Sequence, residues 1–295
     1  MARSALTHPD RVYYPDEGIS KRDVRDYYRS VADRLLPHAA GRPLSLVRCP
    51  GGIAEGCFFQ RHYSESLPDG IKPVTLHEKS GDKAEYLMIE DAGGLEALAQ
   101  IGALEIHPWG STVRELEQPE RIIFDLDPDA GLDFSDVKAA ALTVSALLEA
   151  AGLTPFVMLT GGKGLHVIAP LIPEADWKMV KDFARTLARV LAAREPDRFV
   201  AEAAKKKREG RIFIDWLRNQ RGQTSVCPYS LRARPGAPVA TPLRWDELAR
   251  AGSASAYRLK TISRRLSALN ADPWEGYFDS AETLSPAALK ILKRA

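Results

Sequence analysis

The stretch "RIIFDLDPD", Arg121 to Asp129, decides how the rest of the sequence is interpreted. Residues 121–124 predict a buried strand, and Asp125, Asp127 and Asp129 then follow in alternation. Alternate side chains of a strand lie on one face, so Asp125 and Asp127 are expected to point the same way. Two carboxylates that close repel each other unless a cation lies between them. The stretch therefore predicts either a divalent-cation site or a strand end whose carboxylates cap the next turn or helix.

Composition excludes several classes of protein. The chain has 295 residues, 45% hydrophobic and 27% charged, which excludes a disordered or collagen-like protein. It has no apolar run long enough to cross a bilayer, and no apolar secretory segment at its N-terminus. The net charge is only +2, so phosphate binding would depend on local basic clusters. The three cysteines, Cys49, Cys57 and Cys227, lack CxxC spacing, which favours a reducing compartment, hence the cytoplasm, and gives little support for a zinc site.

The order of predicted elements indicates the fold class. A helix is expected from Ser20, its cap, to Pro37, and longer helices over 135–151, capped by Ser135, and 173–194. Strands are expected at "AEYLMIED", "LEIHPWG", "TPFVMLT", "LHVIAP" and "IFIDWL". Helices and strands in this irregular order favour an α+β fold over a regular doubly wound sheet.

A third aspartate strengthens the cation hypothesis. Asp215, in "FIDWLRN", lies within an apolar strand, where an acid is costly to bury unless it is paired or metal-bound. Carboxylates together with substrate phosphates are the ligands that Mg²⁺ or Mn²⁺ prefers. Three aspartates from two strands therefore predict a two-metal site for phosphoryl or nucleotidyl transfer.

The stretch "LTGGKGLHV" predicts a phosphate-binding loop after a strand. Its glycines let the backbone approach a ligand closely, and Lys163 and Thr160 add a charge and a hydroxyl donor. The spacing is not that of a P-loop. His166, on the next strand, either donates to a phosphate or is structural.

A phosphatase is one rival interpretation. "FDLDPD", followed by a strand ending at Thr160, resembles the haloacid-dehalogenase-type phosphatases. Pro128 and Asp129 replace the Gly-Thr pair of that class, however, and over a hundred residues precede the motif. The class also leaves "GGKGLH" and "DWLRN" unexplained.

In their order, "DLDP", "TGGKGLH" and "DWLRN" resemble the three motifs of the archaeo-eukaryotic primase superfamily, in particular the polymerase domain of bacterial DNA ligase D. The resemblance extends over nearly the whole chain, through "HPDRVYYPDEGISKRDVRDYY", "CFFQRH", "IHPWGS" and "CPYSLRARPGAPVATPL". It implies one α+β domain, with a primase-like core around a mixed or antiparallel sheet in a cleft, flanking helices and an N-terminal extension. The expected parts are a DNA-end-binding region over about 1–100, a catalytic core over 101–245 and C-terminal helices over 246–295, packed on the core.

The resemblance also implies a function: template-dependent nucleotidyl transfer that fills gaps and extends broken ends in bacterial non-homologous end joining. Asp125, Asp127 and Asp215 match the catalytic positions that bind two divalent cations, Mn²⁺ or Mg²⁺. The substrate is an NTP or dNTP, with ribonucleotides and Mn²⁺ favoured. The nucleotide-binding residues expected on these grounds are His107, Thr160, Lys163, His166, Arg208, Arg218 and Arg232; Arg218 is alternatively a partner of Asp215.

Contacts to DNA are implied in the same way. Arg11 and Lys21 match basic positions that hold the 5′-phosphate across a gap. Phe58 and Phe59, if on a strand, point to opposite faces, so one is expected in the core and the other stacked on a template base. The expected partners are DNA with 5′-phosphorylated gaps or ends, a Ku-like protein and a ligase, in cis or in trans; no membrane is expected. A monomer at the bacterial nucleoid is expected.

Two alternatives within nucleic-acid biology stay open. A de novo primase would share the chemistry but lack 5′-phosphate recognition, so Arg11 and Lys21 discriminate against it. A non-catalytic DNA-end-binding module would not need all three carboxylates. The chain is expected to be either an excised domain of a larger ligase or a stand-alone homologue.

Overall fold

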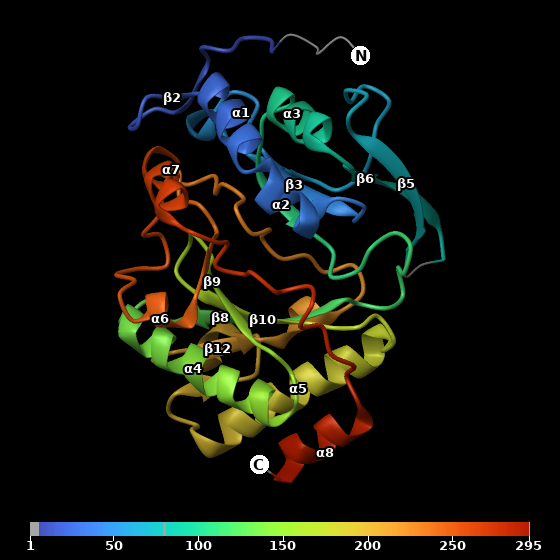
Figure 1. Ribbon diagram of the computed structural model, residues 1–295, viewed down its shortest axis with the longest axis vertical. Coiled ribbons are helices and arrows are strands. Elements are labelled where there is room, and N and C mark those ends of the chain that lie inside the picture. Colours follow the sequence, from blue (N-terminus) through green and yellow to red (C-terminus); the bar gives the residue numbers. More distant parts are fainter. Residues whose placement is uncertain (1–5, 79–80, 295) are drawn as a thin grey trace. The chain divides into compact units, whose positions relative to one another are not determined.

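The computed structural model describes residues 6–78 and 81–294, which divide into two compact units (Figure 1). The first unit comprises Met1–Trp109, Thr224–Ala240 and Tyr257–Ala268; the second unit comprises Gly110–Gln223, Thr241–Ala256 and Leu269–Ala295. Both mix strands with helices, so the predicted α+β class is confirmed. The ranges 224–240 and 257–268 belong to the first unit, although they are distant from its N-terminal part in sequence.

The first unit is built around a five-stranded sheet. Its central strand, β3 (Leu44–Arg48), pairs with β4 (Phe58–Gln60), β6 (Lys83–Met88) and β7 (Ala103–Pro108), and β5 (Lys72–His77) pairs with β6. The remaining elements are β1 (Val12–Tyr14), β2 (Ile19–Ser20), α1 (Lys21–Ser30), α2 (Ala32–Ala39), η1 (Ile53–Glu55), α3 (Ala92–Gln100) and α7 (Leu259–Ala268).

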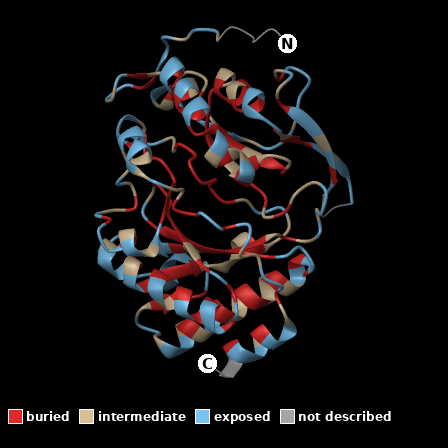
Figure 2. Cartoon of the chain, in the orientation of Figure 1, coloured by how far each residue is buried: buried red, intermediate tan, exposed pale blue. Residues whose placement is uncertain are grey.

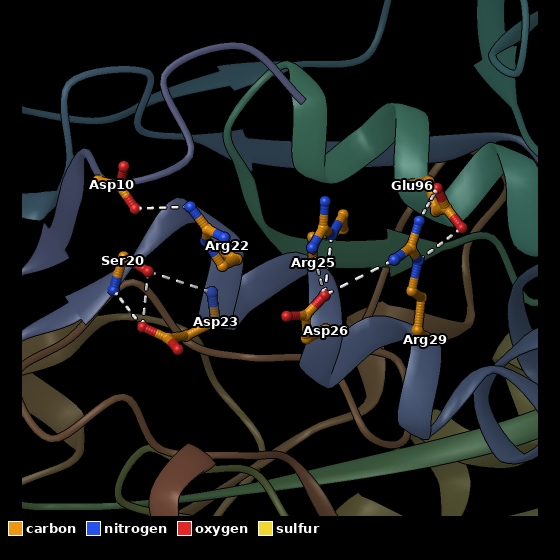
Figure 3. Close-up of polar contacts among 8 residues, drawn as sticks. All are labelled: Asp10, Ser20, Arg22, Asp23, Arg25, Asp26, Arg29 and Glu96. Carbon is orange, nitrogen blue, oxygen red and sulfur yellow. Dashed lines mark hydrogen bonds and ion pairs between the residues drawn. The ribbon is translucent and has the colours of Figure 1, made fainter. Parts of the chain in front are cut away.

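The start of α1 follows from its sequence. Ser20 Oγ accepts a hydrogen bond from the Asp23 amide (3.3 Å), and the Asp23 carboxylate accepts one from the Ser20 amide (2.7 Å), which makes a capping box (Figure 3). The helix predicted from Ser20 to Pro37 is in fact two, because α1 ends at Ser30 and α2 contains Pro37. Arg29 ties α1 to α3 through a bidentate pair with Glu96, also drawn in Figure 3.

The second unit is built around a six-stranded sheet in the order β11-β12-β8-β10-β9-β13. Only β11 and β12 are parallel, so the sheet is mixed, as expected. The strands are β8 (Arg121–Pro128), β9 (Phe156–Leu159), β10 (Leu165–Pro170), β11 (Phe199–Val200), β12 (Ile212–Asp215) and β13 (Thr241–Leu243).

Helices α4 (Phe134–Ala150) and α5 (Trp177–Arg194) cover one face of this sheet (Figure 1), and their inward faces are buried (Figure 2). Asp133 caps α4, so the prediction of Ser135 as the cap is wrong; the shift of two residues lets Asp136 close a capping box. The other helical elements are α6 (Trp245–Leu248), α8 (Pro286–Arg294), η2 (Lys205–Lys207) and η3 (Trp216–Asn219).

Two further observations bear on the sequence-based expectations. None of the helices in the described part of the chain is long and apolar enough to cross a membrane. Cys49 and Cys57 form a disulfide across the loop between β3 and β4, and Cys227 is buried. The cysteine pattern therefore does not mean that all three thiols are reduced. Cys49 and Cys57 are eight residues apart, and the loop between them brings the two side chains close enough to form the disulfide.

Candidate active site

The three aspartates lie on neighbouring strands of the second unit. Asp125, on β8, is the register partner of Asp215, the last residue of β12, and Asp127 lies two residues further along β8. The β8 side chains alternate: Phe124 and Leu126 are buried, whereas Asp125 is partly exposed and Asp127 is half exposed. The pleat of the strand therefore turns both carboxylates to the same face, as predicted.

Arg218 bridges two of these carboxylates. Its Nε lies 3.1 Å from Asp215 Oδ2, and its Nη2 lies 3.2 Å from Asp125 Oδ2. Asp215 also ends the strand and caps η3 by accepting from the Leu217 amide (3.0 Å). The structure therefore supports the alternative in which Arg218 is a partner of Asp215, and adds Asp125 to that contact.

Asn219 is a residue that the sequence reasoning missed. Its side chain is buried and forms a pair of hydrogen bonds with the backbone of Ile123, accepting from the amide (2.8 Å) and donating to the carbonyl (2.7 Å). These bonds fasten η3 to β8 and so fix Arg218 beside Asp125. The signal was the asparagine at the end of "DWLRN", since a buried amide requires partners for both of its ends.

His166 lies against the same cluster. It is the register partner of Asp125 on β10, is buried, and places Nε2 3.5 Å from Asp125 Oδ1. Within the described residues its Nδ1 has no hydrogen-bond partner. Its role in nucleotide binding stays a prediction.

The aspartates differ in their pKa values because their neighbours differ. Burial alone would raise the pKa of Asp125, but His166 and Arg218 together lower it to about 2. Burial raises the pKa of Asp127, and the Asp125 charge raises it further. Burial also raises the pKa of Asp215, against the influence of Arg218. The charged forms of two of the three carboxylates are thus destabilised, and a nearby cation would stabilise them.

The donor set suits a hard divalent cation, but the side chains are engaged elsewhere. Three carboxylates from two neighbouring strands supply the oxygen ligands that Mg²⁺ and Mn²⁺ take. Across residues 6–78 and 81–294, however, no three His, Cys, Asp or Glu side chains form a group arranged to hold a metal ion. The three carboxylates instead contact Arg218, His166 and Arg208, and a cation would have to replace some of these contacts.

The predicted phosphate-binding loop lies beside β8. Thr160 Oγ1 donates to the Gly164 carbonyl (2.8 Å) and accepts from the Gly162 amide (3.3 Å), so the hydroxyl shapes the loop. A Cβ at Gly164 would lie 2.0 Å from the Leu126 carbonyl oxygen, so only glycine allows the loop this close to β8. Lys163 is exposed, and its charge offsets part of the rise in the pKa of Asp127 that burial causes.

Arg208 is directed at an aspartate. Its Nη1 donates to Asp127 Oδ2 (2.8 Å), and its guanidinium lies 3.9 Å from the centre of the Phe213 ring. Asp129, the third acid of the opening stretch, accepts from the Gly210 amide (2.9 Å) and so holds the turn that follows Arg208. This turn lies 81 residues further along the chain, so the bond is not the local cap of the next turn or helix that the sequence left open.

The other two predicted nucleotide-binding residues belong to the first unit. His107 and Arg232 both contact Glu105, a buried acid on β7 that the sequence reasoning missed. The signal was present in "LEIHPWG", where an acid stands between two apolar residues, the same argument that singled out Asp215.

The predicted 5′-phosphate residues lie close together in the first unit. The Lys21 amide donates to the Arg11 carbonyl (2.8 Å). The pKa of Lys21 is lowered mainly by burial and, to a smaller extent, by the charge of Arg11. Lys21 Nζ donates to the Thr7 carbonyl (3.0 Å), and Arg11 Nη1 to the Pro50 carbonyl (2.9 Å). Two cationic groups this close repel each other, an arrangement that an anion would stabilise.

Both predicted stacking residues are exposed. The exposed fractions of Phe58 and Phe59 are 48% and 78%, so the expectation that one lies in the core is wrong. Among the described residues their strand, β4, pairs with β3 alone, so it lies at an edge of the sheet. The Arg48 guanidinium lies 5.2 Å from the centre of the Phe58 ring.

Comparison with known proteins identifies the family. The sequence model of one protein family, the LigD primase-polymerase domain, matches residues 20–274 of this chain. The chain belongs to the LigD primase-polymerase family. A multifunctional non-homologous end joining protein LigD from Pseudomonas aeruginosa is 36% identical over 98% of the chain and 34% of its own length. A bifunctional LigD from Bacillus subtilis is 28% identical over 98% of the chain and 46% of its own length.

A solved structure resembles this LigD primase-polymerase domain closely. It is the polymerase domain of Mycobacterium tuberculosis ligase D in complex with DNA, with a TM-score of 0.87, 30% identity, and coverage of 95% of this chain and 100% of that one. The chain spans about a third of the length of the P. aeruginosa relative. Family membership implies a nucleotide substrate, metal ions and nucleotidyl transfer, and it gives the phosphatase interpretation no support.

Proposed function

We propose that this chain is a template-dependent nucleotidyltransferase that fills gaps and extends broken ends during bacterial non-homologous end joining. The observation that carries the proposal is the register of β8 and β12, which gathers Asp125, Asp127 and Asp215 on one face in a chain of the LigD primase-polymerase family. These three carboxylates would hold two divalent cations. Such cations neutralise the triphosphate and lower the pKa of the primer 3′-hydroxyl.

The positively charged side chains of the protein have a separate role in this proposal. Arg208 and Lys163 surround Asp127 with positive charge that can pass to the phosphates of an incoming nucleotide. Arg218 holds Asp125 and Asp215 in place, and Thr160 shapes the loop that presents Lys163. His107 and Arg232 are proposed as further nucleotide contacts.

End joining is favoured over de novo priming by one specific observation. Arg11 and Lys21 are adjacent cationic groups, which suits an anion such as a terminal phosphate. A primase that starts chains has no downstream 5′-phosphate to recognise. A Ku-like protein and a ligase, in cis or in trans, are proposed partners on the strength of the family's end-joining relatives.

A primer-extension assay tests the proposal. The substrate is labelled gapped DNA with or without a 5′-phosphate, supplied with rNTPs or dNTPs and Mn²⁺ or Mg²⁺. Template-matched addition that the 5′-phosphate stimulates is the expected result. Addition indifferent to that phosphate, together with primer-free synthesis, would favour a primase. Tight binding to the phosphorylated end without addition would leave a non-catalytic end-binding module.

A further inference from the structure

Glu105 is a charged residue in a place where charge is costly. It lies in the middle of β7, its side chain is 8% exposed, and its strand neighbours Leu104 and Ile106 are fully buried. An isolated carboxylate at such a position would be strongly destabilising. A charged Glu105 side chain at this position therefore needs polar partners, and the structure supplies three.

The partners include two of the predicted nucleotide-binding residues. His107 Nε2 lies 2.8 Å from Glu105 Oε2, Arg232 Nε lies 3.1 Å from the same oxygen, and the Ala233 amide donates to Oε1 (2.9 Å). Against the effect of burial, these contacts lower the pKa of Glu105 to about 2. The carboxylate is therefore ionised at neutral pH and connects side chains 125 residues apart.

Glu105 and His107 share a face of β7 because they are two residues apart on a strand. The segment that carries Arg232 runs beside that strand: Ser230 Oγ accepts from the Ile106 amide (2.9 Å), and the Cys227 amide donates to the Ile106 carbonyl (2.9 Å). The backbone around Arg232 is thus docked on β7.

Two buried tyrosines also hold the same segment. Tyr14 Oη donates to the Arg232 carbonyl (2.8 Å), and Tyr27 Oη donates to the Tyr229 carbonyl (2.7 Å). With the backbone held in this way, the remaining freedom of Arg232 lies in its long side chain. Glu105 is placed to remove that freedom.

We infer that Glu105 is a positioning residue for nucleotide binding, which orders the side chains of His107 and Arg232 before the nucleotide arrives. The inference rests on the proposed function. Ordering a flexible side chain in advance removes a cost that binding would otherwise bear. The loss of Glu105 should therefore weaken nucleotide binding without changing the chemistry that follows.

A purely electrostatic view predicts the opposite sign. Removing a negative charge beside Arg232 would make the surroundings more positive and favour a triphosphate. A purely structural view predicts lower stability with the KM unchanged, because breaking a buried ion pair destabilises the fold. The KM for the incoming nucleotide thus separates the three views.

The experiment compares Glu105→Gln with wild type in gap filling, and measures binding of a non-hydrolysable ribonucleoside triphosphate. We expect KM and Kd to rise together by about 10-fold, with kcat within about 2-fold. In a double-mutant cycle, adding Glu105→Gln to Arg232→Ala should raise the KM little further, because the two residues act as one unit. Glu96→Gln, which breaks the Arg29 pair of the same unit, is the control and should leave the KM unchanged.

If Glu105→Gln does not fold, Glu105→Asp replaces it: the charge stays, but the shorter side chain withdraws from its partners, so the KM should still rise. An unchanged or lower KM in a folded variant would overturn the inference while wild type still extends primers. If wild type neither binds the nucleotide nor extends a primer, the proposed function itself fails.

Discussion

Asp125 and Asp215 face each other across the antiparallel strands β8 and β12, and one guanidinium, that of Arg218, contacts both carboxylates. The acidic cluster is therefore held in shape by arginine before any divalent cation binds. Burial raises the pKa of Asp127 and of Asp215, which means that it destabilises their charged forms. A bound cation would stabilise those charged carboxylates.

Asp127→Ala should abolish primer extension, by at least about 100-fold, and leave the protein folded. Asp127 is half exposed and lies beside Asp125, so its removal relieves repulsion more than it disturbs packing. Primer extension and thermal melting are the measurements. Asp182→Asn, which breaks an exposed pair with Lys178, is the control that should keep activity. Wild-type incorporation by Asp127→Ala would refute the metal-binding role.

Glu105 should make stability depend on pH. Its pKa is lowered to about 2, below the value of about 4.3 of an unfolded chain, so its contribution is present at neutral pH and disappears as the pH falls from about 4 to 2. At pH 7 the free energy of unfolding of Glu105→Gln should be lower than that of wild type by about 3 kcal/mol. Denaturant unfolding at several pH values measures this difference, and a difference that does not shrink in acid would contradict the assignment.

Arg11→Gln should weaken binding to gapped DNA with a 5′-phosphate by about 10-fold and leave binding to the unphosphorylated gap unchanged. The substitution removes one of two adjacent cationic groups from an exposed position. Titration of both DNAs at a fixed salt concentration gives the comparison. Arg22→Gln, on the neighbouring helix and paired with Asp10 in Figure 3, is the matched control. Equal losses for both variants would mean that only general charge matters.

Phe59→Ala should weaken template binding by about 1–3 kcal/mol without lowering stability. At 78% exposure, the ring contributes little to the core, so its loss is felt only when a base stacks on it. Fluorescence anisotropy with a labelled template and a thermal melt are the two measurements. Leu142→Ala on α4, another exposed apolar residue, should alter neither. Unchanged template affinity for Phe59→Ala would exclude the stacking role.

Cys57→Ser should lower the free energy of unfolding by about 2–3 kcal/mol under oxidising conditions, because the Cys49–Cys57 bond restricts a loop of the unfolded chain. Under a dithiol reductant the wild-type protein should become as unstable as the variant. Denaturant titrations with and without the reductant provide the test. Equal stability of the two proteins under oxidising conditions would show that the bond adds nothing.

Local features were predictable from sequence because they depend on neighbours in the chain. The Ser20 cap was identified correctly, since a capping box needs only residues three apart. The Ser135 cap was wrong by two residues, and the single helix to Pro37 proved to be two, because local signals define an element better than its ends. The exposure of both Phe58 and Phe59 could not be inferred, since it depends on β4 pairing with a single strand, β3, in the part of the chain that the structure describes.

The sequence by itself determined that Asp125 and Asp127 share a face, because the alternation of a strand is a local property of the backbone. It also predicted a glycine-rich loop after a strand, whereas the close approach of Gly164 to β8 is known from the structure alone. Only the tertiary structure decided that Asp215 lies opposite Asp125, that Arg218 contacts both, and that Glu105 reaches Arg232. Apart from the local pair of Arg218 with Asp215, these contacts join residues about 90 to 130 positions apart, and they follow from strand order and docking, which no local pattern encodes.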